Sequence, residues 1–314
     1  MPRIVFSRTS FFAAFDISPV LRSVHVMSLV AEGGHLGSEG LRSRRTSITT
    51  VWPLCAMEIH VLVKESVDVS TLEYDQRTLE PLLEKAQRKV GDFEMNAVEE
   101  AVRLKEKHGG VVKLLSAGPS VQPIVLRETL AMGADEAYAV SDPRLRDADP
   151  WVYANVLAAL SRKAGKADLI IAGEASVDES NYQVGVRVAE ELGMPSLTHV
   201  VKLEVSGERV VAYRSLEDGI EVVESRMPAV VTVGLEINTP RLPSLLMIRA
   251  SAKKPIHQVK LEDLALPEEK LRPLTRKTSV RVMRTERKRV VVEGSLEEAA
   301  EKLIAYLRSE GVLR

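Results

Sequence analysis

The chain has almost none of the residues that build disulfide frameworks and cysteine-rich metal sites. Its 314 residues include a single cysteine, Cys55. One cysteine excludes an intrachain disulfide and any metal site made of several thiolates. The six histidines are scattered, without the HxxxH or HExxH spacing of a metal-binding helix. We therefore expect no protein-bound metal.

Long apolar runs and a strong excess of either charge are also missing. No run approaches the roughly 20 apolar residues that span a bilayer, so we expect no direct membrane insertion. The formal net charge is −1, which gives no reason to expect nucleic acid or an anionic membrane as the main partner. The sequence predicts a soluble, cytoplasmic protein.

Signatures of common hydrolases are absent as well. The sequence has no GxSxG, no Walker A motif and no GxGxxG after its first strand. Asp178 and Glu179 are candidate acid–base carboxylates, but acids before a helix more often favour its dipole and accept backbone N–H bonds. We expect binding without hydrolysis.

Residues 1–56 differ from the rest of the chain. They are rich in Ser, Thr, Arg and Gly, and no helix or strand period lasts long enough to form an element. The apolar cluster 11–15 is shorter than the h-region of about 7–15 residues in a secretory signal, and the Arg/Ser bias only weakly suggests a transit peptide. We predict a disordered or misassigned extension before a start at Met57. An intact mass of the natural protein that includes 1–56 would contradict this.

From Met57 onward, strand patterns alternate with helical patterns. This rhythm predicts βαβ units and an α/β fold, with a mostly parallel sheet and helices on both faces. Residues 66–90 read as a polar, irregular segment, with a short helix around Pro81 as the alternative. The expected strands are 59–63, 111–115, 137–140, 169–172 and 229–234, and the expected helices are 95–107, 124–132 and 151–163.

The stretch 168–193 has the pattern of a buried parallel strand that leads through a polar loop into a helix. The apolar run ends at Gly173, and apolar residues return at helical spacing from Val184. We predict Ser180 or Asn181 as the N-cap of this helix. Such a corner at the carboxyl end of a strand is where α/β sheets bind nucleotides. An ordinary βα turn is the alternative.

Two further loops follow strands in the same way. Small or polar residues come after Val63 and after Leu115, and again after Ala172. Because the carboxyl ends of parallel strands share one sheet edge, we expect these three loops to line one cleft.

The C-terminal half changes character. Alternating runs at 200–205, 209–214 and 220–225 predict an antiparallel hairpin excursion. The proline-rich segment 238–256 reads as an extended arm and not a core element, although by apolar character alone Leu245 and Leu246 would be core residues. The basic run 276–289 fits a solvated strand better than nucleic-acid binding. Residues 295–309 predict an amphipathic helix with a capping box, Ser295 and Glu298, docked on its own domain or on a partner.

One segment of the hairpin region resembles a known family signature. Residues 212–223 read Ala-Tyr-Arg-Ser-Leu-Glu-Asp-Gly-Ile-Glu-Val-Val, and Pro-Ala-Val-Val-Thr follows at 228–232. This resembles the signature of the electron transfer flavoprotein beta subunit. Segments in the same order agree across about 57–314, namely 61–64, 93–107, 116–119, 130–135, Pro240-Arg241 and Lys253-Lys254.

The resemblance implies a fold like that of the adenine-nucleotide α-hydrolases and a nucleotide held in this chain. That nucleotide would be AMP or, as in electron-bifurcating relatives, a second FAD, while a separate alpha subunit holds most of the shared FAD. The implied contacts are Leu62, Gly91, Asp92, Phe93, Glu94, Ala117, Gly173, Glu174, Ala175, Ser176, Val177, Asp178, Glu179, Ser180, Asn181, Tyr182, Gln183 and Val184.

Three positions bear on which nucleotide is bound. The family usually has Asn-Pro-Phe at 91–93, where this chain has Gly-Asp-Phe. It commonly has Lys-Gln-Ala at 174–176, so Glu174 replaces a cation near a phosphate. Residues 183–185 resemble the form found in bifurcating members.

The resemblance also assigns partners and domains. It implies a nucleotide-binding domain over 57–237, and over 238–314 a partner-recognition arm and a segment that docks on the alpha subunit. Leu245 would anchor flavin dehydrogenases. The implied function is electron transfer from flavin dehydrogenases or NADH, via FAD, to a quinone oxidoreductase or ferredoxin. A stand-alone adenine-nucleotide-binding or sensing protein is the alternative, and a nucleotide hydrolase a third.

Overall fold

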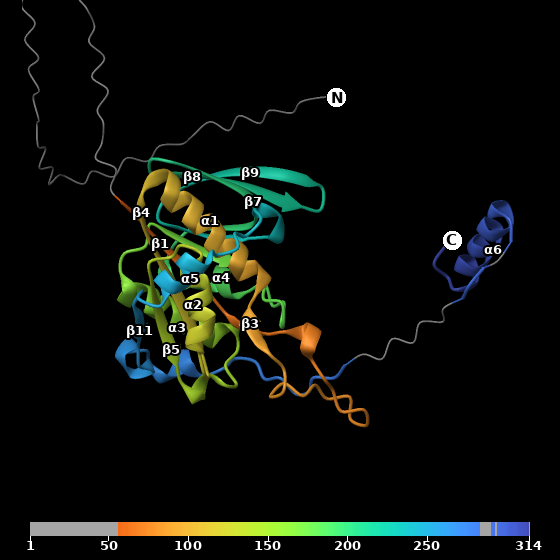
Figure 1. Ribbon diagram of the computed structural model, residues 1–314, viewed down its shortest axis with the longest axis horizontal. Helices are drawn as coiled ribbons and strands as arrows, with labels where there is room; N and C mark the ends of the chain where they lie inside the picture. The colour runs from red at the N-terminus through yellow and green to blue at the C-terminus, as the bar shows by residue number, and fades with distance from the viewer. Residues whose placement is uncertain (1–55, 283–289, 293, 314) are drawn as a thin grey trace, which may run out of the picture. The chain divides into compact units, whose positions relative to one another are not determined.

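The computed structural model describes residues 56–282, 290–292 and 294–313. Their main feature is a nine-stranded sheet (Figure 1) with the strand order β11-β5-β4-β1-β6-β10-β7-β8-β9. Its strands are β1 Met57–Leu62, β4 Gly110–Gly118, β5 Glu136–Ser141, β6 Leu169–Gly173, β7 Ser196–Ser206, β8 Arg209–Leu216, β9 Gly219–Arg226, β10 Ala229–Val233 and β11 Ile256–Gln258.

The central strands are parallel and buried on both faces. β1 pairs in parallel with β4 and β6, and β6 pairs in parallel with β10. Every residue of β10 is buried. Strands covered on both sides are expected to be continuously apolar, which explains the Val- and Ile-rich runs of the sequence. The predicted α/β class, with a mostly parallel sheet, is confirmed.

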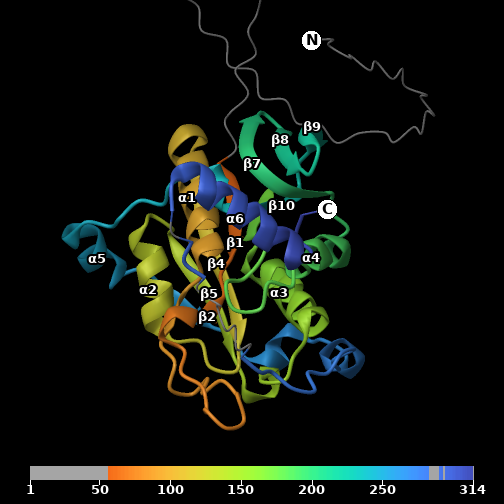
Figure 2. The ribbon, with the colours of Figure 1, turned by 90° about the vertical axis from the view of Figure 1, so that its right-hand side faces the viewer.

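Helices cover both faces of the sheet (Figure 2). α1, Asp92–His108, and α2, Pro123–Ala131, pack on one face, where Ala97, Val98 and Ala101 enter a core shared with β1 and β4. α3, Pro150–Ala164, and α4, Val184–Leu192, pack on the other. Apolar positions at helical spacing account for both layers.

An antiparallel meander, β7-β8-β9, occupies one end of the sheet (Figure 2). It confirms the predicted hairpin excursion. β7 also pairs in parallel with β10, so the meander continues the main sheet.

In the loops, one alternative fails and one prediction was wrong. The alternative of a short helix around Pro81 fails, because residues 72–87 form turns and an isolated β-bridge joins Tyr74 to Pro81. The strands on either side of these turns, β2, Glu65–Val67, and β3, Arg88–Val90, pair as a two-stranded antiparallel sheet. The segment 238–256 is not simply extended either. It contains α5, Leu245–Ser251, and its last residue begins β11, which joins the main sheet beside β5.

The C-terminal residues include α6, Leu296–Ser309, which begins at the predicted capping box of Ser295 and Glu298. None of its side chains is buried.

Of the basic run, residues 276–282 form no strand, and 283–289 lie outside the described residues. The prediction for the N-terminal extension also lies outside them, apart from residue 56. Short 3-10 turns occur at Val69–Thr71, Pro143–Leu145, Leu235–Ile237, Leu261–Leu264 and Glu268–Leu271.

Candidate functional site

A cavity of about 570 Å³ opens where β1, β4 and β6 end. Leu62, Ala117 and Gly173 contribute to its wall, one from the carboxyl end of each strand. β1 has β4 on one side and β6 on the other. The chain therefore builds outward from β1 in two directions, and the crevice at such a switch point is the usual ligand site of open α/β sheets.

The cavity brings together most of the predicted site residues. Those that line it are Leu62, Glu94, Ala117, Gly173, Glu174, Ala175, Ser176, Asp178, Glu179, Asn181, Tyr182, Gln183 and Val184. Five others do not, namely Gly91, Asp92, Phe93, Val177 and Ser180. Leu245 lies on α5, outside this cavity.

The residues that do not line the cavity shape its surroundings. Asp92 is exposed and lies 3.5 Å from Lys89. A Cβ at Gly173 would lie 2.6 Å from Cβ of Phe93, so glycine is needed there for the loop after β6 to pass under α1. Phe93 thus leaves no room for a side chain at position 173.

The loop after β6 is tighter than its sequence suggested. Ser180 donates hydrogen bonds from its backbone N, at 2.9 Å, and from Oγ, at 3.1 Å, to the carbonyl oxygen of Ser176. Ser180 and Tyr182 have φ of 47° and 56°. The prediction of Ser180 or Asn181 as N-cap was therefore wrong. Gln183 is the N-cap, without a side-chain capping bond, so the N-terminus of α4 faces the cavity through Gln183, Val184 and Gly185.

A partly buried ion pair joins the loops after β1 and β6. Lys64 Nζ donates to Asp178 Oδ1 at 2.6 Å and to Ser176 Oγ at 3.2 Å, and the backbone N of Val67 donates to Asp178 Oδ2 at 3.3 Å. Burial alone would raise the pKa of Asp178, but Lys64 and these hydrogen bonds lower it below its usual value. Asp178 therefore holds two loops together as an anion.

Glu174 is turned toward the meander. Its Oε2 lies 3.0 Å from Nδ1 of His199 on β7, and its backbone N donates to the carbonyl of Val233 at 3.0 Å. Tyr182 stacks at an angle on the same histidine, with ring centroids 6.2 Å apart. The carboxylate of Glu174 thus has a partner of its own.

Sequence reasoning missed the cations of the cavity wall. Lys64, Arg88, Arg146 and Lys277 all line it. Lys64 directly follows the predicted buried strand 59–63, and this position alone could have indicated that it lies at the carboxyl edge of the sheet. Lys277 is about a hundred residues distant from the loop that it meets, where it pairs with Glu179, and nothing in its local sequence points there.

The segment around Lys277 is fastened to α3. Asp149, the N-cap of α3, accepts hydrogen bonds from the backbone N atoms of Leu274 and Thr275, both at 2.9 Å, as well as from Val152 N. These bonds lower the pKa of Asp149 although burial opposes them. The C-terminal segment thereby reaches the cavity wall.

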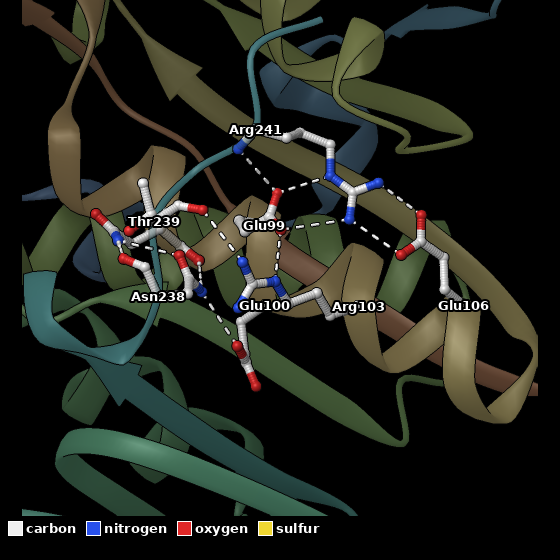
Figure 3. Close-up of polar contacts among 8 residues, drawn as sticks. Glu99, Glu100, Arg103, Glu106, Asn238, Thr239 and Arg241 are labelled. Carbon is white, nitrogen blue, oxygen red and sulfur yellow. Dashed lines mark hydrogen bonds and ion pairs between the residues drawn. The ribbon is translucent and has the colours of Figure 1, made fainter.

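A second candidate region is the segment that leads into α5 (Figure 3). Arg241 Nε donates to Glu99 at 2.8 Å, and Arg241 Nη1 donates to Glu106 at 2.6 Å. Asn96 and Asn238 exchange hydrogen bonds through side chain and backbone. Figure 3 shows these contacts converging on one side of α1. The segment is therefore held to α1 before it turns outward.

The other end of this segment is held to α2. Arg127 donates to the carbonyl oxygens of Ser251 and Lys254, and Lys254 Nζ donates to that of Leu130 at 2.9 Å. Between the two anchors, Leu245 is 78% and Leu246 75% exposed. The expectation from apolar character that both are core residues was wrong, because Ser251 is the one buried residue of α5.

The described part of the chain contains no cluster of three or more His, Cys, Asp or Glu side chains that could hold a metal ion. Within the same residues, no helix combines the length and apolar character needed to cross a bilayer.

The profile of the electron transfer flavoprotein domain matches residues 82–264. The chain is 34% identical to an electron transfer flavoprotein subunit beta of Thermoanaerobacterium thermosaccharolyticum, over 82% of this chain and 100% of that protein. It is 34% identical to the subunit of that name in Bacillus subtilis, over 70% and 86%. A protein named caffeyl-CoA reductase-Etf complex subunit CarD, from Acetobacterium woodii, is 35% identical over 68% of this chain and 82% of its own length.

Proposed function

The chain belongs to the electron transfer flavoprotein family, as a beta subunit, and from this premise we propose that it pairs with an alpha subunit around FAD and passes electrons between a donor and a downstream acceptor. The donors would be flavin dehydrogenases or NADH, and the acceptor a quinone oxidoreductase or ferredoxin. We further propose a cytoplasmic location, which cell fractionation would test.

The observation that carries the proposal is the cavity at the switch point. Its volume of about 570 Å³ falls within the usual range of small-molecule sites. The uncapped N-terminus of α4 offers backbone N–H groups to an anion, and Lys64 adds a cation. Ala117, Gly173 and Ala175 are small enough to let a nucleotide approach the backbone. These residues fit an adenylate, whether it is AMP or part of a second FAD.

The choice between the two nucleotides turns on the loop 174–185. Glu174 stands where a cation would favour a phosphate, and His199 partly offsets its charge when protonated. The resemblance of 183–185 to bifurcating members favours a second FAD. AMP would serve only as a structural ligand, whereas a second FAD would supply redox chemistry that this chain's residues bind and orient.

The docking of partners is proposed for the C-terminal part. Residues 57–237 form the nucleotide-binding domain, and 238–314 contribute the recognition arm and α6. Leu245, exposed on α5, is the proposed anchor for a dehydrogenase. The exposed apolar residues of α6, among them Leu296, Leu303 and Ile304, are proposed to dock on the alpha subunit.

The test is the composition of the purified complex. The subunit would be co-expressed with its alpha partner, and the flavin-to-heterodimer ratio measured together with the released nucleotide. One FAD with one AMP supports a simple carrier, and two FAD with NADH reactivity support bifurcation. A colourless homodimer that binds ATP would overturn the proposal in favour of a stand-alone nucleotide-binding protein.

A further inference from the structure

Glu94 is a carboxyl group buried in the wall of the cavity. It lies in the first turn of α1 and is 4% exposed. Its Oε2 has no hydrogen-bond partner among the residues that the structure describes. Buried polar atoms are nearly always paired, so an unpaired one beside a cavity points to a ligand atom as its partner.

The position of this carboxyl is built into the chain. A Cβ at Gly91 would overlap Glu94 Oε2, so only glycine at 91 leaves room for the side chain to fold back at the start of α1. Any larger residue at 91 would displace the carboxyl. Gly91, which does not line the cavity itself, thus contributes to it through Glu94.

The surroundings favour the neutral acid. Burial raises the pKa of Glu94 to about 8, although a hydrogen bond from its own backbone N–H opposes this shift, and Lys64, Asp178 and Asp92 are the charged groups that act on it. Asp178 and Asp92 oppose ionisation, and Lys64 favours it. Lys64, however, is already paired with Asp178 at 2.6 Å. In a site of low dielectric constant, a second uncompensated anion is costly.

We propose that Glu94 acts as a neutral carboxylic acid that donates its O–H to an acceptor atom of the bound adenylate, so that binding takes up a proton. The proton comes from solvent and converts the carboxylate to the acid, with no other bond changed. A negatively charged phosphate in the cavity would repel the ionised form. This inference rests on the proposed nucleotide site and adds its proton linkage.

The linkage has a defined pH signature. With a pKa of about 8 in the empty site, the acid form falls from about nine-tenths at pH 7 to about one-tenth at pH 9. If only the acid form binds, affinity falls about tenfold over this range. A nucleotide phosphate, with its second pKa near 6, is ionised throughout and contributes no slope.

The experiment is calorimetric titration of AMP, and separately of FAD, into the heterodimer depleted of nucleotide by dialysis. At pH 8, in two buffers of different ionisation enthalpy, we expect uptake of about half a proton for each adenylate bound. Glu94→Gln keeps a donor and an acceptor without titrating, so its affinity should match that of wild type at pH 7 and stay constant to pH 9.

The matched control is Glu100→Gln. Glu100 lies on the same helix, is buried and also has a raised pKa, but it does not line the cavity. Proton uptake should be unchanged in this variant. Adenylate binding without proton uptake, or Glu94→Gln binding as weakly as wild type at pH 9, would overturn the inference while leaving the proposed function intact. Failure of both AMP and FAD to bind would overturn both.

Discussion

The cavity and the α5 segment are assembled in opposite ways. The cavity joins loops from four parts of the chain, and a partly buried ion pair between Lys64 and Asp178 links two of them. The α5 segment is one short stretch that exposes leucines and is fastened at both ends, by Arg241 to α1 and by Arg127 to α2.

The difference suggests two kinds of recognition. A cavity lined by small residues and a few charged side chains suits a small charged ligand, whose orientation those charged groups fix. Exposed apolar side chains on a fastened helix suit a protein surface, where a few anchors contribute most of the binding free energy. Substitutions in the two regions should therefore separate ligand retention from partner recognition.

The largest effect on stability is expected from Asp178→Ala. It leaves Lys64 with Glu179, at 3.4 Å, as its remaining ion-pair partner and Val67 N without an acceptor, so the free energy of unfolding should fall by about 2 kcal/mol. Urea denaturation measures this change, and nucleotide content should fall with it. Asp263→Ala, at an exposed position, should change neither. Full stability in Asp178→Ala would mean that the ion pair does not hold the cavity together.

Arg241→Ala should have a smaller, more local effect. It leaves Glu99, which is 2% exposed, with Arg103 as its remaining cation, and should cost about 1–2 kcal/mol. Amide hydrogen exchange over 242–251 should accelerate while the loop 173–184 is unaffected. Arg249→Ala, exposed on α5, is the control. Equal acceleration in both loops would show that the two regions are not independent.

Leu245→Ala should affect partner recognition and leave stability and cofactor content unchanged, the opposite of Asp178→Ala. Because Leu245 is 78% exposed, stability should change by less than about 0.5 kcal/mol. Electron transfer from a partner dehydrogenase should slow about tenfold, as for an interface hot spot, with FAD content unchanged. Leu313→Ala, near the end of the chain, offers a control, and unaltered transfer kinetics in Leu245→Ala would argue against the docking role.

The smallest expected effect is on how strongly the stability of the protein depends on acidic pH. The pKa of Asp178 is lowered in the folded protein, with Lys64 overcoming the opposing effect of burial. Its ionised form therefore stabilises the fold above the unfolded pKa of about 3.9, and this contribution is lost as pH falls through the lower folded value. Denaturation curves from pH 5 to pH 2 should lose stability more slowly for Asp178→Asn. Identical slopes would assign acid sensitivity to other groups, such as Asp149.

Much of the fold could be predicted because the signals are local. Strands such as β6 and β10 are continuous apolar runs, and α1 repeats apolar residues at helical spacing. The capping box of α6 was equally visible, because it needs only Ser295 and Glu298. The errors arose where a hydrogen bond within a loop or a pairing between distant strands decides. The start of α4 moved because Ser180 bonds back to Ser176, and β11 formed because β5 offered an open edge.

In the cavity, too, some features could be predicted from the sequence and others could not. That loops after Val63, Leu115 and Ala172 share one edge follows from parallel strands, and could be argued from sequence. Lys277 and Glu94 could not be placed in this way. The role of Lys277 depends on a fastening at Asp149, and that of Glu94 on its depth beneath the cavity surface.

By itself, the sequence determined the α/β class, the hairpin excursion and the family signature at 212–232, because each depends on residue type and spacing within a short stretch. Tertiary structure alone decided which charges meet and which are hidden. Lys64 and Asp178 pair across 114 residues, and Glu94 is buried although it lies in the first turn of a helix. Burial and long-range pairing set the energy of a charge, and neither is a property of the local sequence.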